Sequence, residues 1–488
     1  MTYLSFEFFI MVAIAVIVYY IVPSKHRWIV LLAASAYFYY KAVQDWRTIC
    51  IFASSIIISY TFGIAIYRSI HKPRRKNEKQ RKSSIVLLWI GIIASAFPLF
   101  ITKANTFVFG AILHRQAFSL IIPLGLSFYS LQIIAYLVDI YRGNIKAEKG
   151  FFKYALFISF FPQIVQGPIP RYDQLSKQLF GGGKLKYDNF VRGFQLILWG
   201  FFLKLMIADK AGIYVDNFFT HYSSYNGIYS WVAGILYSIQ LYTDFQSCVV
   251  ISQGVARLFD ITLVDNFSRP YFSQSVQEFW RRWHESLSFW LRDYVYISLG
   301  GNRKGKLRKY INLLITFVVS GLWHGNGFKF LFWSILHAIY QIAGSINKKF
   351  TEAVYKFLNL PDLIERIVRC VLTFFFVMIA WIIFRAPSMR TGISVVLSLF
   401  HFNIWELFNG GVYNLGLDRN NFAILNLSIL VLIIAGALQE RGTDIGEKVS
   451  SLNVVVKFIF YFVVIICIWT FGTYGFGFDA KDFIYGGF

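Results

Sequence analysis

Three histidines lie in apolar or aromatic surroundings where an imidazole could carry out chemistry. His324 stands in the run Ser320-Gly-Leu-Trp-His-Gly325, His284 lies in a stretch rich in Trp and Arg, and His337 lies in an apolar run. A neutral imidazole can take a proton from a hydroxyl while the hydroxyl oxygen attacks an activated acyl group. These residues are therefore candidates for general-base catalysis of acyl transfer. The alternatives are a histidine that hydrogen-bonds a neighbouring helix, for His324, and an incidental histidine of an ordinary interfacial helix, for His284.

Motifs for other kinds of catalysis do not occur in the sequence. The four cysteines stand singly, without metal-ligand spacing, at Cys50, Cys248, Cys370 and Cys467. There is no Ser-His-Asp order, no G-x-S-x-G elbow and no Gly-rich phosphate loop. We therefore expect no metal and no permanently bound cofactor, and we expect the acyl group to arrive as a thioester from the cytoplasm.

The elements that position these histidines are predicted to be membrane helices. Of 488 residues, 57% are hydrophobic and only 15% are charged, whereas a soluble domain carries about 25% charge. Apolar runs of about 17–25 residues recur, each long enough to cross a bilayer. This composition excludes a soluble enzyme, a disordered scaffold and a secreted disulfide protein. It predicts an all-α polytopic membrane protein.

The predicted spans follow from the apolar runs and the basic loops. The loop 68–82 holds eight basic residues and one acid, and no Lys or Arg precedes Lys25. The positive-inside rule then places this loop in the cytoplasm and the N-terminus outside. The same rule explains the net charge of +23 without nucleic acid as a partner. We expect spans at 6–22, 28–40, 49–67, 85–101, 119–141, 311–323, 328–346, 368–384, 422–438 and 454–469.

Residues 150–310 differ from the rest, because Pro, Gly and charge break their apolar stretches, as in 160–171 and 181–184. Irregular backbone at membrane depth is tolerated only where protein or a water-filled cavity surrounds it. This middle third is therefore the predicted place of a site.

The setting of His324 is predicted from the helix that leads to it. If that helix begins near Tyr310, His324 lies fourteen residues along it, at a depth of roughly 20 Å. An ionisable residue at that depth is a functional hypothesis by default. The flanking Gly321 and Gly325 would let another backbone or a substrate approach closely.

His284 and His337 are predicted to lie in different settings. A helical wheel over 279–293 gathers Trp and Leu on one face and charged residues on another, with His284 at the seam. This pattern predicts one continuous interfacial helix with its Trp side in the membrane. Thirteen residues separate His337 from His324, which places it off the His324 face of a shared helix, so we interpret it as structural.

The run 277–303, followed by Gly321-Leu-Trp-His-Gly325, resembles the membrane-bound O-acyltransferase (MBOAT) family. The similarity is greatest to the branch that holds the alginate O-acetyltransferase membrane subunit, peptidoglycan O-acetyltransferases and the teichoic-acid D-alanyl transfer protein. Supporting motifs occur at 123–129, 136–143, 161–168, 242–245 and 266–271.

The resemblance implies a ring of about 10–12 transmembrane helices around a central funnel or tunnel, with short interfacial and re-entrant helices. It implies N-terminal helices at 1–118, a catalytic core at 119–346 and C-terminal helices at 347–488. His324 matches the essential catalytic residue, and His284 matches the second functional histidine. The implied tunnel residues are Trp283, Trp323, Asp244, Tyr242 and Asn302.

One of these assignments stays open on the residues themselves. The run Tyr242-Thr-Asp-Phe-Gln-Ser247 lacks the Gly- and Ser-containing continuation that is usual in alginate-type proteins. Asp244 could therefore line the tunnel, cap a helix or pair with Lys204.

The resemblance also implies the function. An acetyl group would pass from a cytoplasmic donor, acetyl-CoA or a phosphopantetheine acyl carrier, across the bacterial cell membrane. The acceptor would be a hydroxyl of an extracellular or periplasmic polysaccharide, or a partner acyltransferase. One alternative is D-alanyl transfer to teichoic acid from a carrier protein. The other is a lipid-linked glycan transporter, although the repeats and paired broken helices of transporters are not found.

Overall fold

Helices make up the regular structure of this chain. The computed structural model describes residues 1–71, 78–105, 107–109, 118, 120–225, 227–325, 327–401 and 403–474. Within those ranges every regular element is a helix, apart from one antiparallel bridge between Phe267 and Trp283. The predicted all-α class is confirmed.

The α-helices of the first half are α1 (Phe6–Ile21), α2 (Arg27–Ala42), α3 (Trp46–Ile70), α4 (Glu78–Asn105), α5 (Leu126–Arg142), α6 (Phe151–Ser159), α7 (Tyr172–Gly181), α8 (Tyr187–Phe201), α9 (Asp209–Thr220) and α10 (Ile228–Arg257). Those of the second half are α11 (Val276–Arg282), α12 (Glu285–Trp290), α13 (Gly305–His324), α14 (Phe328–Ile346), α15 (Lys348–Leu358), α16 (Asp362–Arg385), α17 (Met389–Ser398), α18 (Arg419–Glu440), α19 (Ile445–Ser450) and α20 (Val454–Phe471). Short 3₁₀ turns are η1 (Ser24–His26), η4 (Tyr222–Ser224), η5 (Pro270–Phe272), η7 (Ile404–Leu407) and η8 (Gly411–Asn414), and π-helical segments are η3 (Phe202–Ala208) and η6 (Leu291–Tyr296).

Six helices in the described residues are long and apolar enough to cross a membrane: α3, α4, α16, α18, α20 and the continuous helix Tyr187–Thr220. The chain is therefore an integral membrane protein, as predicted. The helices α1 and α2 are shorter, at 16 residues each. The span Tyr187–Thr220 was not among the predicted ones, because the charges of Lys204, Asp209 and Lys210 interrupt its apolar pattern.

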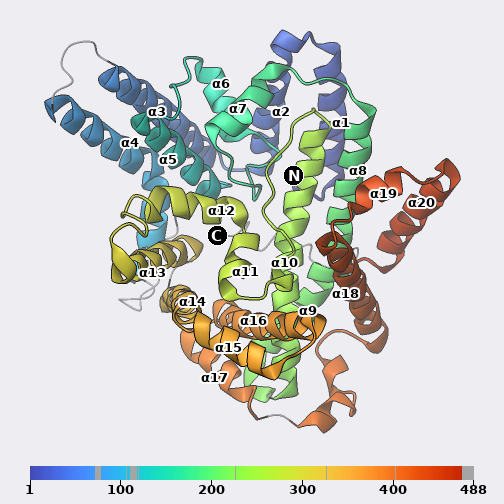
Figure 1. The fold of residues 1–488 in the computed structure, drawn as a ribbon. Coiled ribbons are helices and arrows are strands. Elements are labelled where there is room, and N and C mark those ends of the chain that lie inside the picture. Colours follow the sequence, from blue (N-terminus) through green and yellow to red (C-terminus); the bar gives the residue numbers. More distant parts are fainter. Residues whose placement is uncertain are drawn as a thin grey trace.

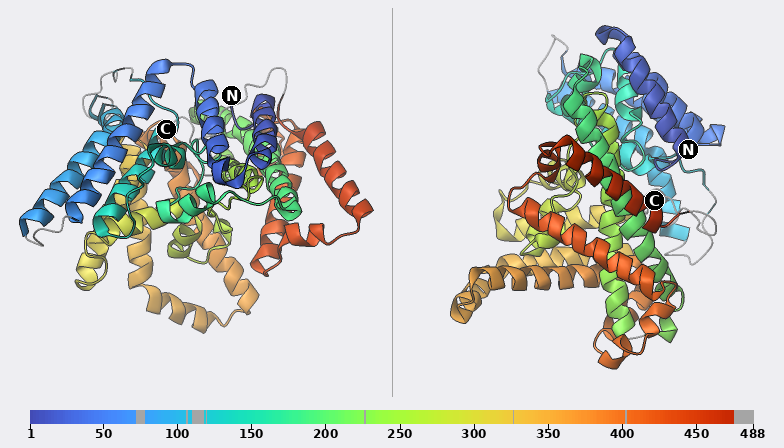
Figure 2. Two further views of the ribbon diagram at one scale, coloured as in Figure 1. Left: turned by 90° about the horizontal axis from the view of Figure 1, so that it is seen from above. Right: turned by 90° about the vertical axis from the view of Figure 1, so that its right-hand side faces the viewer.

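The helix α10 passes through the centre of the molecule (Figure 1). Helices α3–α5 gather on one side of it and α18–α20 lie on the other, and the left view of Figure 2 agrees. On α10, 21 of 30 residues are buried. It packs closely on α8, where a Cβ atom on Gly193 would lie 2.8 Å from the carbonyl oxygen of Gly254. Small residues allow this backbone contact.

Residues 160–170, between α6 and α7, are non-helical and almost wholly buried. Neighbouring side chains satisfy their backbone groups. The Tyr3 hydroxyl donates to the Phe161 carbonyl oxygen at 2.6 Å, and the amide N–H groups of Phe161 and Ile169 donate to the hydroxyls of Ser35 and Ser286. The prediction of irregular backbone enclosed by protein is confirmed here.

Candidate active site

The stretch around His284 is broken into two helices, so the predicted continuous interfacial helix over 279–293 is wrong. Helix α11 ends at Arg282 and α12 begins at Glu285, with His284 in the left-handed conformation at φ +45° between them. The wheel failed because apolar periodicity continues through the break. A left-handed residue other than Gly carries backbone strain, which is often found at functional sites.

The break buries His284 instead of leaving it at an interface. The side chain is 1% exposed, and neither ring nitrogen has a hydrogen-bond partner among the described residues. Its ring lies 4.7 Å from that of Phe245 on α10 and 6.3 Å from that of Phe128 on α5, centroid to centroid. A buried donor and acceptor without partners are costly, so the imidazole is available to a group that enters the site.

His324 is the last residue of α13, which begins at Gly305 and not near Tyr310 as predicted. The basic residues of 306–309 lie inside the helix, in its first turns. Twenty residues correspond to a length of about 30 Å, so His324 lies at the far end of this helix. The side chain is 3% exposed.

The glycines beside His324 serve contact with a neighbouring helix. A Cβ on Gly321 would lie 2.7 Å from the carbonyl oxygen of Phe330 on α14, and one on Gly325 would lie 2.3 Å from the Phe330 ring. Of the two predicted uses of these glycines, close approach by another part of the protein is the one observed. It brings α13 and α14 together as a hairpin.

Trp323 links the two histidines. Its ring centroid lies 4.8 Å from that of His324 and 6.1 Å from that of His284. Its Nε1–H donates to the carbonyl oxygen of Ser127 at 3.2 Å, which anchors it on α5. The structure therefore brings His324, His284 and Trp323 into one buried cluster built from α5, α10, α12 and α13.

His337 lies on α14, a separate helix, so comparing it with His324 on one wheel was wrong. Its Nδ1 accepts a hydrogen bond from Trp280 Nε1–H at 3.2 Å. Trp333 contacts both histidines, with centroid distances of 5.1 Å to His324 and 5.2 Å to His337. His337 thus lies one aromatic ring away from the cluster and supports the wall around it.

The remaining predicted tunnel residues are divided between this cluster and its surroundings. Trp283 is 1% exposed and packs against Phe267 and Trp381, with Tyr242 at 6.2 Å between ring centroids. Asn302 is exposed in the turn before α13, at the opposite end of that helix from His324.

Asp244 is buried in an ion-pair cluster. Its Oδ1 lies 2.7 Å from Lys204 Nζ, and Asp209 Oδ1 lies 2.9 Å from the same nitrogen. Pairing with Lys204 was one of the options left open by the sequence. Lys204 lies in the π-helical segment η3, and such segments are frequent at functional sites. The next residue on α10, Phe245, packs on His284. The ion pairs therefore fix the part of α10 that contacts the histidine cluster.

In the described residues, no group of three or more His, Cys, Asp or Glu side chains could hold a metal ion.

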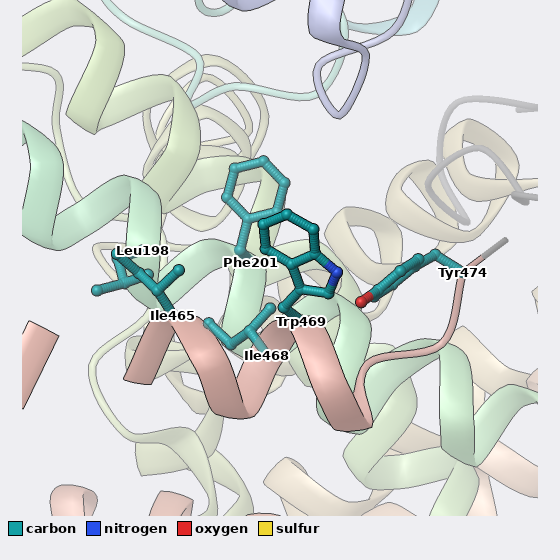
Figure 3. Close-up of a pocket in the computed structure, with 6 residues that line it drawn as sticks. All are labelled: Leu198, Phe201, Ile465, Ile468, Trp469 and Tyr474. Atoms are coloured by element: carbon teal, nitrogen blue, oxygen red, sulfur yellow. The ribbon is translucent and has the colours of Figure 1, made fainter. Parts of the chain in front are cut away.

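An apolar groove of about 400 Å³ lies between α8 and α20 (Figure 3). None of its lining residues is a predicted site residue; they are Leu198, Phe201, Ile465, Ile468, Trp469 and Tyr474.

The chain is similar in sequence to known membrane enzymes. The membrane-bound O-acyltransferase family matches residues 149–386, which include both buried histidines of the cluster. A probable alginate O-acetylase AlgI of Pseudomonas putida is 31% identical over 429 residues, covering 86% of this chain and 82% of its own length. The chain belongs to the membrane-bound O-acyltransferase family.

Two further relatives show the range of acceptors in this family. The peptidoglycan O-acetyltransferase of Helicobacter pylori is 33% identical and covers 77% of this acyltransferase and 74% of its own length. The teichoic acid D-alanyltransferase of Bacillus subtilis is 29% identical and covers 63% of this chain and 79% of its own length. This protein is thus a membrane acyltransferase, and its relatives are named for alginate, peptidoglycan and teichoic acid as acceptors.

Sequence reasoning missed Asn266 and Asp209 as residues of the site region. Asn266 was noted only as part of a family motif, and its contact with the His284 break depends on chain pairing that no local pattern shows. Asp209 could have been found from its spacing, because it follows Lys204 by five residues, the step that closes a π-helical turn.

Proposed function

We propose that this acyltransferase moves an acetyl group from a cytoplasmic thioester to a hydroxyl outside the bacterial cell membrane. The acceptor hydroxyl belongs to an extracellular or periplasmic polysaccharide, or to a partner acyltransferase that completes the transfer. The observation that carries the proposal is the contact of two buried histidine rings, His284 and His324, with the same Trp323. One imidazole can then serve each reactant.

In the proposed reaction, His324 acts as general base. It accepts the proton of the acceptor hydroxyl while the hydroxyl oxygen attacks the thioester carbonyl carbon. The C–S bond then breaks, and the leaving thiolate takes the proton back from the imidazolium. The products are an O-acetyl ester and a free thiol, so atoms and charge balance without a further reactant. Because His324 is 3% exposed, bulk water cannot replace it as the base.

His284 is proposed to hold the donor. Its two ring nitrogens are buried without partners among the described residues, so it can bond to the thioester carbonyl or to an amide of the donor arm. The donor is acetyl-CoA or a phosphopantetheine acyl carrier. The basic residues of 303–309, in the turn before α13 and at the start of that helix, support this assignment, because positive charge at the proposed cytoplasmic mouth attracts an anionic carrier.

The coverage of the relatives favours acetyl over D-alanyl transfer. The alginate-type relative matches 86% of this chain, while the D-alanyltransferase matches 63%. The match over a larger share of this chain therefore supports the acetyl-transferring type.

The test is acetyl transfer to a purified polysaccharide acceptor by single variants at matched protein levels. His324→Ala should lower the rate by at least about 10²–10⁴-fold, the contribution typical of general-base catalysis. His284→Ala should cost less, and His337→Ala, which removes only a wall residue, should cost least. A His324→Ala enzyme with near-normal transfer beside an inactive His337→Ala enzyme would refute the assignment. Transport of a lipid-linked glycan that survives His324→Ala would favour a transporter.

A further inference from the structure

The short segment 266–268 pairs with the chain on both sides of the His284 break. The Ser268 N–H donates to the Arg282 carbonyl oxygen at 3.0 Å, and the Glu285 N–H donates to the Asn266 carbonyl oxygen at 2.9 Å. Between these bonds, Phe267 forms an antiparallel bridge with Trp283. The residues before and after His284 are therefore fixed by one neighbouring strand-like segment.

Asn266 adds a side-chain bond to this pairing. Its Oδ1 accepts from the Ser286 N–H at 3.3 Å, and its side chain is fully buried. A backbone N–H needs an acceptor, so this bond fixes which end of the amide is the oxygen. The Nδ2 group is then left buried without a partner among the described residues. An apolar residue would avoid that unsatisfied donor, so the amide is present for the bond that Oδ1 makes.

The conformation of His284 requires such support. A left-handed backbone at a residue other than Gly persists only where the surrounding structure over-determines it. Asn266 bonds to the two residues that follow His284, through its backbone oxygen to Glu285 and through its side chain to Ser286. The Ser286 hydroxyl in turn accepts from the Ile169 N–H at 3.0 Å, which ties the turn to the buried segment 160–170.

We propose that Asn266 is a positioning residue for His284, holding the left-handed turn that directs this imidazole into the cluster with Trp323. The inference rests on the proposed function, because it assigns His284 a role in acyl transfer. It predicts that Asn266 acts only through the position of the imidazole. Loss of Asn266 should therefore matter only when His284 is present.

A double-mutant cycle tests this dependence. We would measure kcat and the donor KM for Asn266→Ala, His284→Ala and the double variant in the full-length protein. Asn266→Ala should lower kcat by about 10²-fold, the effect of a displacement near 1 Å, with little change in KM. In the His284→Ala background the same substitution should change kcat less than about threefold, because coupled residues are not additive.

The matched control is Asn189→Ala. Asn189 is also a buried asparagine, and its Nδ2 donates to Asp260 Oδ1 at 2.6 Å on another part of the molecule. Asn189→Ala should leave kcat close to that of the parent protein, both in the wild-type background and in the His284→Ala background.

Three outcomes would overturn the inference: wild-type kcat in Asn266→Ala, losses that multiply in the double variant, or an equal loss in Asn189→Ala. If Asn266→Ala does not accumulate, Asn266→Asp is measured in its place, since aspartate keeps the acceptor oxygen. Transfer by Asn266→Asp clearly above transfer by His284→Ala then supports the inference, and equal transfer by the two variants opposes it. A wild-type protein without acetyl transfer would instead refute the proposed function.

Discussion

The centre of the molecule and its C-terminal edge are both built from apolar helices, yet they are organised differently. The central span Tyr187–Thr220 has a mean hydropathy of 1.5 and contains Lys204 and Asp209, and its neighbour α10 is largely buried. The edge helix α20 has a mean hydropathy of 2.5, and only Ile468 is buried on it. Figure 2 shows α20 at the periphery.

The difference shows which residues face lipid and which face protein. Charged groups at membrane depth occur where other helices surround them, because lipid offers them no partner. Exposed apolar side chains on α20 meet acyl chains and need no partner in the protein. Hydropathy alone does not separate the two cases, since α16 also has a value of 2.5 but far more of it is buried.

The central ion pairs provide the test with the largest expected effect. Replacing Lys204 by Met removes the cation between two buried carboxylates, and breaking a buried pair costs about 3–5 kcal/mol. Lys457→Met is the matched change on α20, where Lys457 Nζ donates to the Ser450 carbonyl oxygen and forms no ion pair among the described residues; it should cost less than about 1 kcal/mol. Thermal unfolding of the purified variants measures both. Equal costs would remove the contrast between the two regions.

A smaller loss is expected when a buried tryptophan of the centre is truncated. Trp283→Ala should reduce the free energy of unfolding by about 3 kcal/mol through the cavity it leaves, and it should impair acyl transfer by releasing the His284 turn. Trp469 on α20 is 71% exposed, so Trp469→Ala should change stability by less than about 0.5 kcal/mol. Arg292→Lys, at an exposed pair with Asp293, should be similarly mild. Negligible effects of both Trp283→Ala and His284→Ala on transfer would mean that the break between α11 and α12 has only a structural role.

The smallest effect is expected at the contact between α19, at the C-terminal edge, and α8, in the central span, where Asp444 pairs with Arg192. Burial raises the pKa of Asp444, but the Glu447 N–H and Arg192 outweigh it and hold this pKa below its ordinary value. A lowered folded-state pKa stabilises the fold above the unfolded value of about 3.9 and loses that contribution as pH falls through the folded value.

Acidification below about pH 4 should therefore loosen the contact of α19 with α8. Asp444→Asn should remove this dependence at a cost below about 1 kcal/mol, since the pair is partly exposed. Proteolysis between α18 and α20 as a function of pH measures it. A variant that keeps the wild-type pH profile would contradict the assignment to Asp444.

The comparison also separates what the sequence could predict from what it could not. The span predicted at 328–346 coincides with α14, and that at 6–22 with α1 to within one residue, because uninterrupted apolar runs identify lipid-facing or hairpin helices. The central helix Tyr187–Thr220 was missed because its charges interrupt the apolar pattern, and the sequence does not show that Lys204 pairs with Asp209 in the same helix and with Asp244 on α10.

The site was predictable in its residue types and not in its shape. His324 and His284 stood out because ionisable residues are rare in apolar surroundings. The left-handed turn at His284 depends on the segment 266–268, which lies outside both helices that flank the turn. Pairing with such a separate segment leaves no periodicity in the local sequence. The contact through Trp323 depends on where α5 and α13 meet, which is a tertiary property.

The π-helical segment η3 also determines where the length of this chain can vary. A π turn contains one residue more than an α-helical turn. Deleting a single residue from Phe202–Ala208 would therefore let this stretch close as regular α-helix, with little change in the orientation of α9 relative to α8. If the deleted residue lies between Lys204 and Asp209, their spacing falls from five residues to four, which still places both side chains on one face. A single-residue deletion is therefore expected to be tolerated at η3, whereas one in the α-helical part of α8 would rotate α9 by about 100°.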